Sequence, residues 1–178
     1  MYTDLKVYIF VGVIVMKTVE TVNQYMKIYS SPPERVRVAS RALIIRDGKI
    51  LLTFEKNTGV YMSPGGGAES GETLEECCIR ELKEESGYVV RPFEHFITIN
   101  EYSYETLYVS NYFLCEIESE CERSLTKTEV EHGVMPVWID IDEAFEIFST
   151  YPTKAQDHMS LYLREYTVLS RMKENRNA

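Results

Sequence analysis

The run from Gly66 to Tyr88 constrains this chain more than any other part of its sequence. It reads GGAESGETLEECCIRELKEESGY, a glycine-rich entry followed by a charged helical pattern. At about 100° per residue, Leu74 and Cys78 begin an apolar stripe on one face of the expected helix. Glu81 and Glu85 follow them at a spacing of seven residues, so the apolar stripe turns into a carboxylate stripe.

A third carboxylate, Glu84, lies one helical step from Glu81 on the same face. Because like charges at close range raise the cost of ionising one another, this cluster favours a counter-cation. Oxygen ligands of this kind suit Mg²⁺ or Mn²⁺, which keep open positions for substrate phosphates. The alternative is a solvated charged face, since glutamate is also a good helix former.

The residues in front of the helix favour the site over the solvated face. Pro64–Gly67 lets the backbone approach a ligand closely, and it leads into a helix amino terminus suited to anions. Gly71–Glu72 is expected to start the helix, with Thr73 and Glu76 as a capping box.

Glu72 lies eight residues before Arg80, slightly more than two helical turns, so we hypothesise that the two form an ion pair. At these residues the sequence resembles the Nudix, or MutT-like, hydrolase family, whose box is G-x5-E-x7-R-E-U-x-E-E-x-G-U with U a bulky aliphatic residue. The departure is an aromatic residue, Tyr88, in the last U position. The matching residues are Gly66, Glu72, Arg80, Glu81, Leu82, Glu84, Glu85 and Gly87.

The resemblance extends from about Arg35 to Met172 and implies an α/β fold, a three-layer α/β/α sandwich with a mixed β-sheet. It implies metal-dependent hydrolysis of a pyrophosphate bond in a nucleoside diphosphate linked to another group. The metal, Mg²⁺ or Mn²⁺, would be held by Glu81, Glu84, Glu85 and the Gly66 carbonyl. The residues expected to act in catalysis are Glu81, Glu84, Glu72 and Arg80.

The proton acceptor is left open between Glu81 and a glutamate from a later loop. In resembling proteins a loop near residues 126–133 brings a further glutamate to the metal site, which makes Glu129 and Glu131 candidates for the base. Independently, Arg41 on the first expected strand is a candidate contact for a substrate phosphate, although a strand arginine is more often solvated.

The glycines Gly65, Gly66 and Gly67 complete the expected substrate contacts, together with one or more tyrosines. Four tyrosines recur at even spacings and are expected to share one face of a strand or hairpin, where they could stack on a nucleobase or pack in a sheet. These residues are Tyr102, Tyr104, Tyr108 and Tyr112.

The substrate class is less sharply indicated. Proteins resembling ADP-ribose pyrophosphatases tend to carry a proline some fifteen residues past the box, where Glu101–Glu105 has none. Dinucleoside polyphosphate hydrolases tend to carry a tyrosine there, a role that Tyr104 could fill. A nucleoside triphosphate pyrophosphatase of the housecleaning type is the close alternative. A nucleotide-binding regulatory module without turnover ranks lower, because the box is intact.

Charge and cysteine content bound the partners and the compartment. A formal net charge of −9 argues against duplex nucleic acid as the main partner but not against a small phosphate ester. The cysteines form no CxxC pair, which favours reduced thiols in a cytoplasmic protein with no membrane partner. They are Cys77, Cys78, Cys115 and Cys121.

The amino-terminal residues 1–33 are expected to form an extension to a domain at 34–174, with a frayed tail at 175–178. Val7–Met16 is uncharged but too short to span a bilayer. It is interpreted as an extra β-strand, which would allow a homodimer or an interaction surface, or as an upstream extension of the gene. Thr18–Tyr29 is expected to be weakly helical, before a linker at Ser30–Pro33.

The remaining pattern predicts strands first and helices last. A hairpin with a turn at Arg46–Lys49 starts the domain, and later segments alternate between strand and polar loop. The expected strands are 36–45, 50–54, 60–63, 88–90, 93–100 and 134–139, the loops 116–123 and 126–133, and the helices 140–148 and 156–173.

Overall fold

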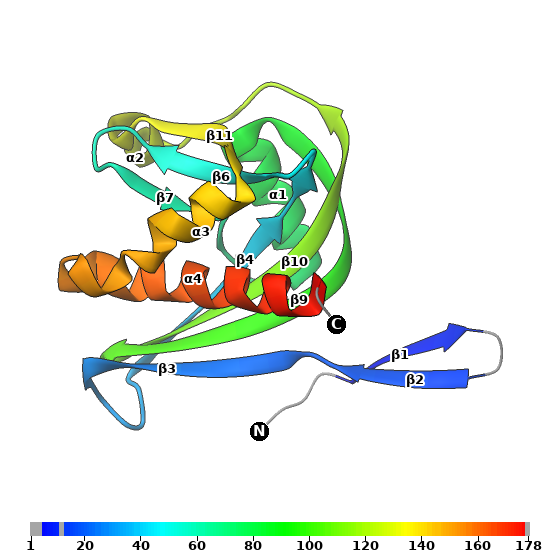
Figure 1. The fold of residues 1–178 in the computed structure, drawn as a ribbon, viewed down its shortest axis with the longest axis horizontal. Helices are drawn as coiled ribbons and strands as arrows, with labels where there is room; N and C mark the ends of the chain where they lie inside the picture. The colour runs from blue at the N-terminus through cyan, green and yellow to red at the C-terminus, as the bar shows by residue number, and fades with distance from the viewer. Residues whose placement is uncertain (1–4, 11–12, 177–178) are drawn as a thin grey trace.

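The fold is described by a computed structural model, which covers residues 5–10 and 13–176 (Figure 1). The strands are β1 (Leu5–Phe10), β2 (Val13–Thr18), β3 (Glu20–Tyr29), β4 (Arg35–Leu43), β5 (Ile45–Arg46), β6 (Lys49–Glu55), β7 (Val60–Met62), β8 (Gly65–Gly67), β9 (Tyr88–Tyr104), β10 (Thr106–Glu120) and β11 (Val134–Asp140). The helices are α1 (Leu74–Ser86), α2 (Lys127–His132), α3 (Ile141–Ser149) and α4 (Gln156–Arg176), with a short 3-10 turn at Tyr151–Thr153.

The strands of the domain form two sheets. A five-stranded mixed sheet has the order β3-β9-β10-β4-β8, with β3 parallel to β9 and β4 parallel to β10. A second sheet has the order β11-β6-β5, and β7 pairs with β6. The strand predicted over 36–45 therefore divides: β4 lies in the first sheet, and only β5 pairs with β6 around the predicted turn.

Helices cover the sheets on both sides, as Figure 1 shows with α1 behind the strands and α3 and α4 in front. The apolar run Ile50–Leu52 of β6 explains how both layers pack. Ile50 and Leu52 belong to the core beneath α3 and α4, whereas Leu51 belongs to the core beneath α1. Because side chains alternate across a strand, a continuous apolar run can be buried on both faces. The predicted mixed-sheet sandwich is confirmed.

Helix α1 has the predicted caps. Thr73 accepts a hydrogen bond from the Glu76 backbone N–H, and Glu76 accepts one from the Thr73 N–H, which completes the capping box. Gly87 ends the helix with φ of 76°, in the left-handed region that favours glycine. The helix starts at Leu74, two residues after the predicted start at Glu72.

The prediction of a weak helix over Thr18–Tyr29 is wrong, because β3 fills this segment. Gln24 and Met26 are the buried residues of β3, which is the period of two of a strand. Pairing with β9 satisfies the backbone and overrides a weak helical preference. The uncharged segment at 7–16 falls on the β1–β2 hairpin, with residues 11–12 outside the described part.

Three further boundaries differ from expectation. The polar segment 126–133 contains helix α2, capped by Thr126 and Glu129, rather than a loop. Most of the acidic segment 116–123 continues strand β10, because its residues pair with Tyr88–Arg91. Helix α4 continues to Arg176, three residues past the predicted end at 173, and residues 177–178 lie outside the described part.

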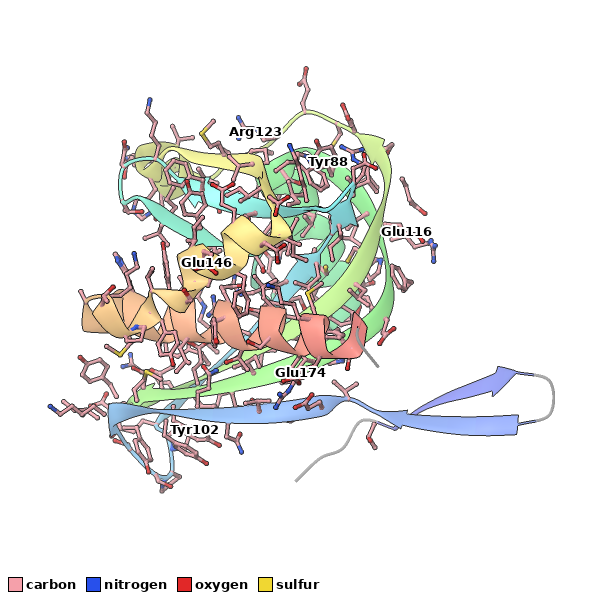
Figure 2. All side chains as sticks on the ribbon, viewed as in Figure 1. Tyr88, Tyr102, Glu116, Arg123, Glu146 and Glu174 are labelled. Atoms are coloured by element: carbon pink, nitrogen blue, oxygen red, sulfur yellow. The ribbon has the colours of Figure 1, made fainter. Side chains whose placement is uncertain are left out.

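The four tyrosines do not share one face. Tyr108 and Tyr112 lie on the α4 side of β10, where Tyr112 is fully buried and contacts α4. Tyr102 pairs with Leu107 instead, and its ring stacks on Tyr25 at 4.8 Å between centroids. Figure 2 shows Tyr102 on the side of β3 away from α4. The hairpin turn between β9 and β10 shifts the pairing, so an even spacing across it does not preserve the face.

All four cysteines are free thiols, as predicted, and Cys77, Cys78 and Cys115 are buried. Within residues 5–10 and 13–176, no helix combines the length and the apolar character needed to cross a membrane.

Candidate active site

The site begins where α1 crosses the short edge strand β8. A Cβ added at Gly66 would lie 2.5 Å from the carboxylate carbon and one oxygen of Glu81. A contact this short would displace the Glu81 carboxylate, so glycine at this position is what lets the carboxylate lie against the backbone. The predicted partners Gly66 and Glu81 are therefore brought together, with Glu81 almost fully buried.

Arg80 is the centre of the charged contacts on α1. Its Nε and Nη2 donate to the two carboxylate oxygens of Glu72 at 2.8 and 3.0 Å, which confirms the hypothesised pair. Its Nη1 donates to Glu81 at 2.8 Å and to Glu84 at 3.2 Å, and Nη2 also donates to the Gly67 carbonyl at 3.0 Å. The hydrogen bonds from Arg80 hold the pKa of Glu72 down to about 2. One guanidinium thus ties the glycine strand to three carboxylates.

Glu85 lies at the junction of the two sheets. Its Oε2 accepts hydrogen bonds from the Thr53 hydroxyl on β6 and from the Gly65 backbone N–H on β8, both at 3.2 Å. Burial raises the pKa of Glu85 to about 7, and the hydrogen bond from Gly65 opposes the shift only in part. Burial also raises the pKa of Glu81, against the attraction of Arg80. Two adjacent carboxylates are therefore costly to ionise here without a further cation.

The two candidate loop glutamates differ in their surroundings. The negative charge of Glu129 contributes to raising the pKa of both Glu81 and Glu85, so Glu129 interacts with these two carboxylates through its charge. Its side chain also accepts the Thr126 N–H at 2.7 Å, as the cap of α2. Glu131 instead is exposed and lies 3.8 Å from the Lys127 ammonium. Of the two, only Glu129 shows an interaction with the box carboxylates.

The donor set fits a divalent cation in its chemistry. Glu81, Glu84 and Glu85 offer hard carboxylate oxygens on one helix face, and Gly66 leaves room beside Glu81 that a Cβ would fill. Across the described part of the chain, no three His, Cys, Asp or Glu side chains are already arranged as a metal-binding group. Glu81 and Glu84 are turned to Arg80, whose guanidinium is their counter-cation in this structure.

A cavity of about 420 Å³ opens beside Gly66, between the five-stranded sheet and α4. The predicted contacts Arg41, Gly66 and Tyr104 all line it. Arg41 Nη1 donates to the Ser63 carbonyl at 2.9 Å and to the Gly65 carbonyl at 3.4 Å. Its Nε is buried and has no hydrogen-bond partner among the described residues.

The other two glycines shape the backbone of the site. A Cβ at Gly65 would lie 2.1 Å from the Ser40 carbonyl oxygen, so β8 packs directly on β4. Gly67 lies beside the Arg37 side chain: a Cβ added at Gly67 would lie 3.6 Å from Arg37 Nη2. Both glycines therefore border the site through the backbone, and only Gly66 lines the cavity itself.

Several cavity residues were missed from the sequence. Arg37 lies on the same side of β4 as Arg41, because the two are four residues apart on one strand. That spacing was a usable signal. Tyr108, one of the four tyrosines considered for stacking, also lines the cavity. The remaining wall comes from β9, β10 and α4, whose approach only the fold reveals: Glu101, Ser103, Ser110, Ser160, Leu161 and Arg164.

Two known proteins match parts of the chain. The chain is 47% identical over 55 residues to the ADP-ribose pyrophosphatase of Methanocaldococcus jannaschii, covering 29% of this chain and 32% of that protein. It is 34% identical over 90 residues to the putative 8-oxo-dGTP diphosphatase YtkD of Bacillus subtilis, covering 51% and 54%. The matches thus span about a third and about half of these relatives.

Solved structures agree with the fold. A NUDIX hydrolase from Nitrosomonas europaea superimposes with a TM-score of 0.55 at 24% identity, covering 74% of this chain and 88% of that one. A putative nudix hydrolase family member from Chromobacterium violaceum gives 0.53 at 19% identity, covering 82% of both chains. At these identities the likeness shows the fold alone.

The model of the NUDIX domain matches residues 35–162, which is well over half of the 178 residues. The matched range contains the box, the cavity strands β4, β9 and β10, and the first residues of α4. The resemblance seen in the sequence is confirmed, and the chain belongs to the NUDIX domain family.

Proposed function

We propose that this protein is a metal-dependent hydrolase of a pyrophosphate bond in a nucleoside diphosphate linked to another group. The observation that carries the proposal is the position of Gly66, which contacts the Glu81 carboxylate and also lines the cavity that holds Arg41. A carboxylate cluster for a cation thus adjoins a pocket with a side chain suited to phosphate.

In this proposal Glu81, Glu84 and Glu85, with the Gly66 carbonyl, hold Mg²⁺ or Mn²⁺. The bound metal would neutralise phosphate charge and lower the pKa of a coordinated water. Arg41 lies at the cavity end of the glycine strand, where its guanidinium orients the phosphate nearest the carboxylates.

The other charged residues serve the geometry and the proton transfer. Arg80 and Glu72 hold α1 against β8, because Arg80 binds both Glu72 and the Gly67 carbonyl. Glu129 is the proposed proton acceptor outside the box, because its charge acts on both Glu81 and Glu85. Glu81 is the alternative acceptor within the box.

The proposed substrates are ADP-ribose, nucleotide sugars and dinucleoside polyphosphates. The name of the M. jannaschii relative, an ADP-ribose pyrophosphatase, supports the first of these. Tyr104 and Tyr108 line the cavity and offer exposed rings that can stack on a base. A nucleoside triphosphate pyrophosphatase is the second candidate, favoured by the longer match to the putative 8-oxo-dGTP diphosphatase.

The deciding experiment is a panel of ADP-ribose, nucleotide sugars, dinucleoside polyphosphates and nucleoside triphosphates, each with Mg²⁺, Mn²⁺ or a chelator. Products are identified by mass. Cleavage of a diphosphate-linked class that stops in chelator supports the proposal, whereas selective release of pyrophosphate from triphosphates supports the second candidate. No cleavage of any member, together with thermal stabilisation by nucleotide, would replace both with a binding module that does not turn over.

A further inference from the structure

A buried polar network joins helix α4 to the turn that precedes the box glycine, and two of its members, Glu101 and Arg164, also line the cavity. Its five members come from four places in the chain, and each exposes 6% or less of its surface: Ser63, Glu101, Tyr112, Arg164 and Glu165. None of these residues belongs to the box. Buried polar groups are retained only where they are well partnered, so the contacts of this network need to be followed individually.

Glu165 is the residue on which the network converges. Its Oε2 accepts a hydrogen bond from the Ser63 hydroxyl at 2.6 Å, and its Oε1 accepts one from the Tyr112 hydroxyl at 2.9 Å. Arg164 Nη2 donates to the same Oε1 at 3.1 Å, and Arg164 Nη1 donates to Glu101 at 2.8 Å. Both carboxylate oxygens are thus engaged, which fixes the side chain of Glu165 from three directions.

The hydrogen bond between Ser63 and Glu165 connects this network to the active site. The carbonyls of Ser63 and Gly65 both accept from Arg41 Nη1, and the Gly65 N–H donates to Glu85. Between them, the Pro64 carbonyl accepts from the Ala42 N–H at 2.9 Å. The turn at residues 63–65 therefore lies between Glu165 on one side and both Arg41 and Glu85 on the other.

Charged groups on both sides of the Ser63–Glu165 hydrogen bond oppose movement of the turn. Arg164 with Glu101 and Glu165 leaves one uncompensated negative charge in a buried position, which is costly unless a cation lies nearby. On the site side Arg41 supplies a positive charge, which acts on both Tyr112 and Glu85. Ser63 therefore connects two charged groups that each lose favourable partners if the turn moves.

We propose that Glu165 is a positioning residue for the active site, acting through Ser63 to hold the 63–65 turn against Arg41 and Glu85. This inference rests on the proposed hydrolase function. Glu165 does not line the cavity itself, although its partner Arg164 does; through Ser63 it sets where the Gly65 N–H and the Arg41 guanidinium lie.

The test compares two single hydroxyl deletions on the same carboxylate. Ser63→Ala removes the bond that leads to the turn. Tyr112→Phe removes the bond to Glu165 Oε1 and the bond that the hydroxyl accepts from Arg164 Nε at 2.8 Å, neither of which leads to the turn. Because Tyr112→Phe also leaves Arg164 Nε without this acceptor, it is expected to lose at least as much stability as Ser63→Ala. Because a displacement of about 1 Å costs about 100-fold in rate, we expect Ser63→Ala to lower kcat by about 10- to 100-fold and to change KM less than about threefold.

Tyr112→Phe is expected to keep kcat within about threefold of the wild type. Glu165→Met, which keeps the length of the side chain but removes both acceptor oxygens, is expected to fall with Ser63→Ala. Equal losses of kcat in Ser63→Ala and Tyr112→Phe, or unchanged kcat in Ser63→Ala with a lowered Tm, would reduce the network to a purely structural role and overturn the inference.

Amide hydrogen exchange separates this inference from the proposed function. In chelator and without substrate, the Gly65 amide is protected by its bond to Glu85, and we expect faster exchange over residues 63–67 in Ser63→Ala but not in Tyr112→Phe. That result supports the positioning role even if the wild type hydrolyses nothing in the panel. Equal exchange in both variants contradicts it whatever the activity.

Discussion

Replacing Glu85 by Gln should make the metal-free protein more stable at alkaline pH while removing its activity. The side chain keeps its shape, and an amide oxygen can still accept from Thr53 and Gly65. What the substitution removes is the negative charge that burial opposes, since burial raises the pKa of Glu85 to about 7. The sign and size of the change in the free energy of unfolding caused by Glu85→Gln therefore follow from this pKa shift.

The pKa of Glu85 is higher in the folded state than in the unfolded chain. Protonation therefore favours folding, and this contribution is fully present below the unfolded pKa of 4.5 and is lost as the pH rises through about 7. At pH 8 the ionised carboxyl costs the fold about 3 kcal/mol relative to its neutral form, and at pH 5 about 1 kcal/mol. Glu85→Gln removes this cost at every pH.

The assay is urea unfolding of the wild type and Glu85→Gln in chelator at pH 5 and pH 8. We expect the variant to exceed the wild type by about 3 kcal/mol at pH 8, equivalent to roughly 6 to 12 °C in Tm for a chain of this length, and by much less at pH 5. A variant that is less stable at pH 8, or that shows the same difference at both pH values, would refute the account of Glu85 as a buried carboxyl awaiting a cation.

Three further substitutions test other parts of the site. Gly66→Ala places a methyl group 2.5 Å from the Glu81 carboxylate, so turnover should fall at least about 100-fold while circular dichroism shows a retained fold; activity near the wild type would contradict the packing. Because Arg80 lowers the pKa of Glu72 to about 2, Glu72 stabilises the fold above about pH 4.5 and less as the pH falls toward 2. The Tm of the wild type should therefore drop more steeply over that range than the Tm of Glu72→Gln, and parallel curves would count against the pair. Glu129→Gln should lower kcat at least about tenfold with Glu131→Gln as the matched control, and equal effects would remove Glu129 as the base.

The local features of the site could be predicted from the sequence. The capping box, the glycine at the end of α1, and the Glu72–Arg80 pair all lie within one helical segment, where spacing alone sets which side chains meet. The requirement for glycine at position 66 is likewise local to the contact between β8 and α1.

The distant contacts could not be read from spacing. Ser63 and Glu165 are 102 residues apart in sequence, and neither residue type at its position suggests a partner. Strand β3 was missed because its polar residues carry little β pattern, and only pairing with β9 makes it a strand. A cytoplasmic location, a homodimer, the domain limits, and the absence of duplex nucleic acid or membrane partners stay predictions.

The most direct test of the central claim is a Mn²⁺ titration at neutral pH, in which electron paramagnetic resonance measures the concentration of the free ion. The wild type is compared with Glu81→Gln and, as a control, with Glu116→Gln, whose exposed side chain pairs with Arg91 away from the box. We predict saturable binding in the wild type and the control, and at least about tenfold weaker binding in Glu81→Gln. Equal Mn²⁺ binding by all three proteins, or none by the wild type, would contradict the assignment of the box carboxylates as the metal site.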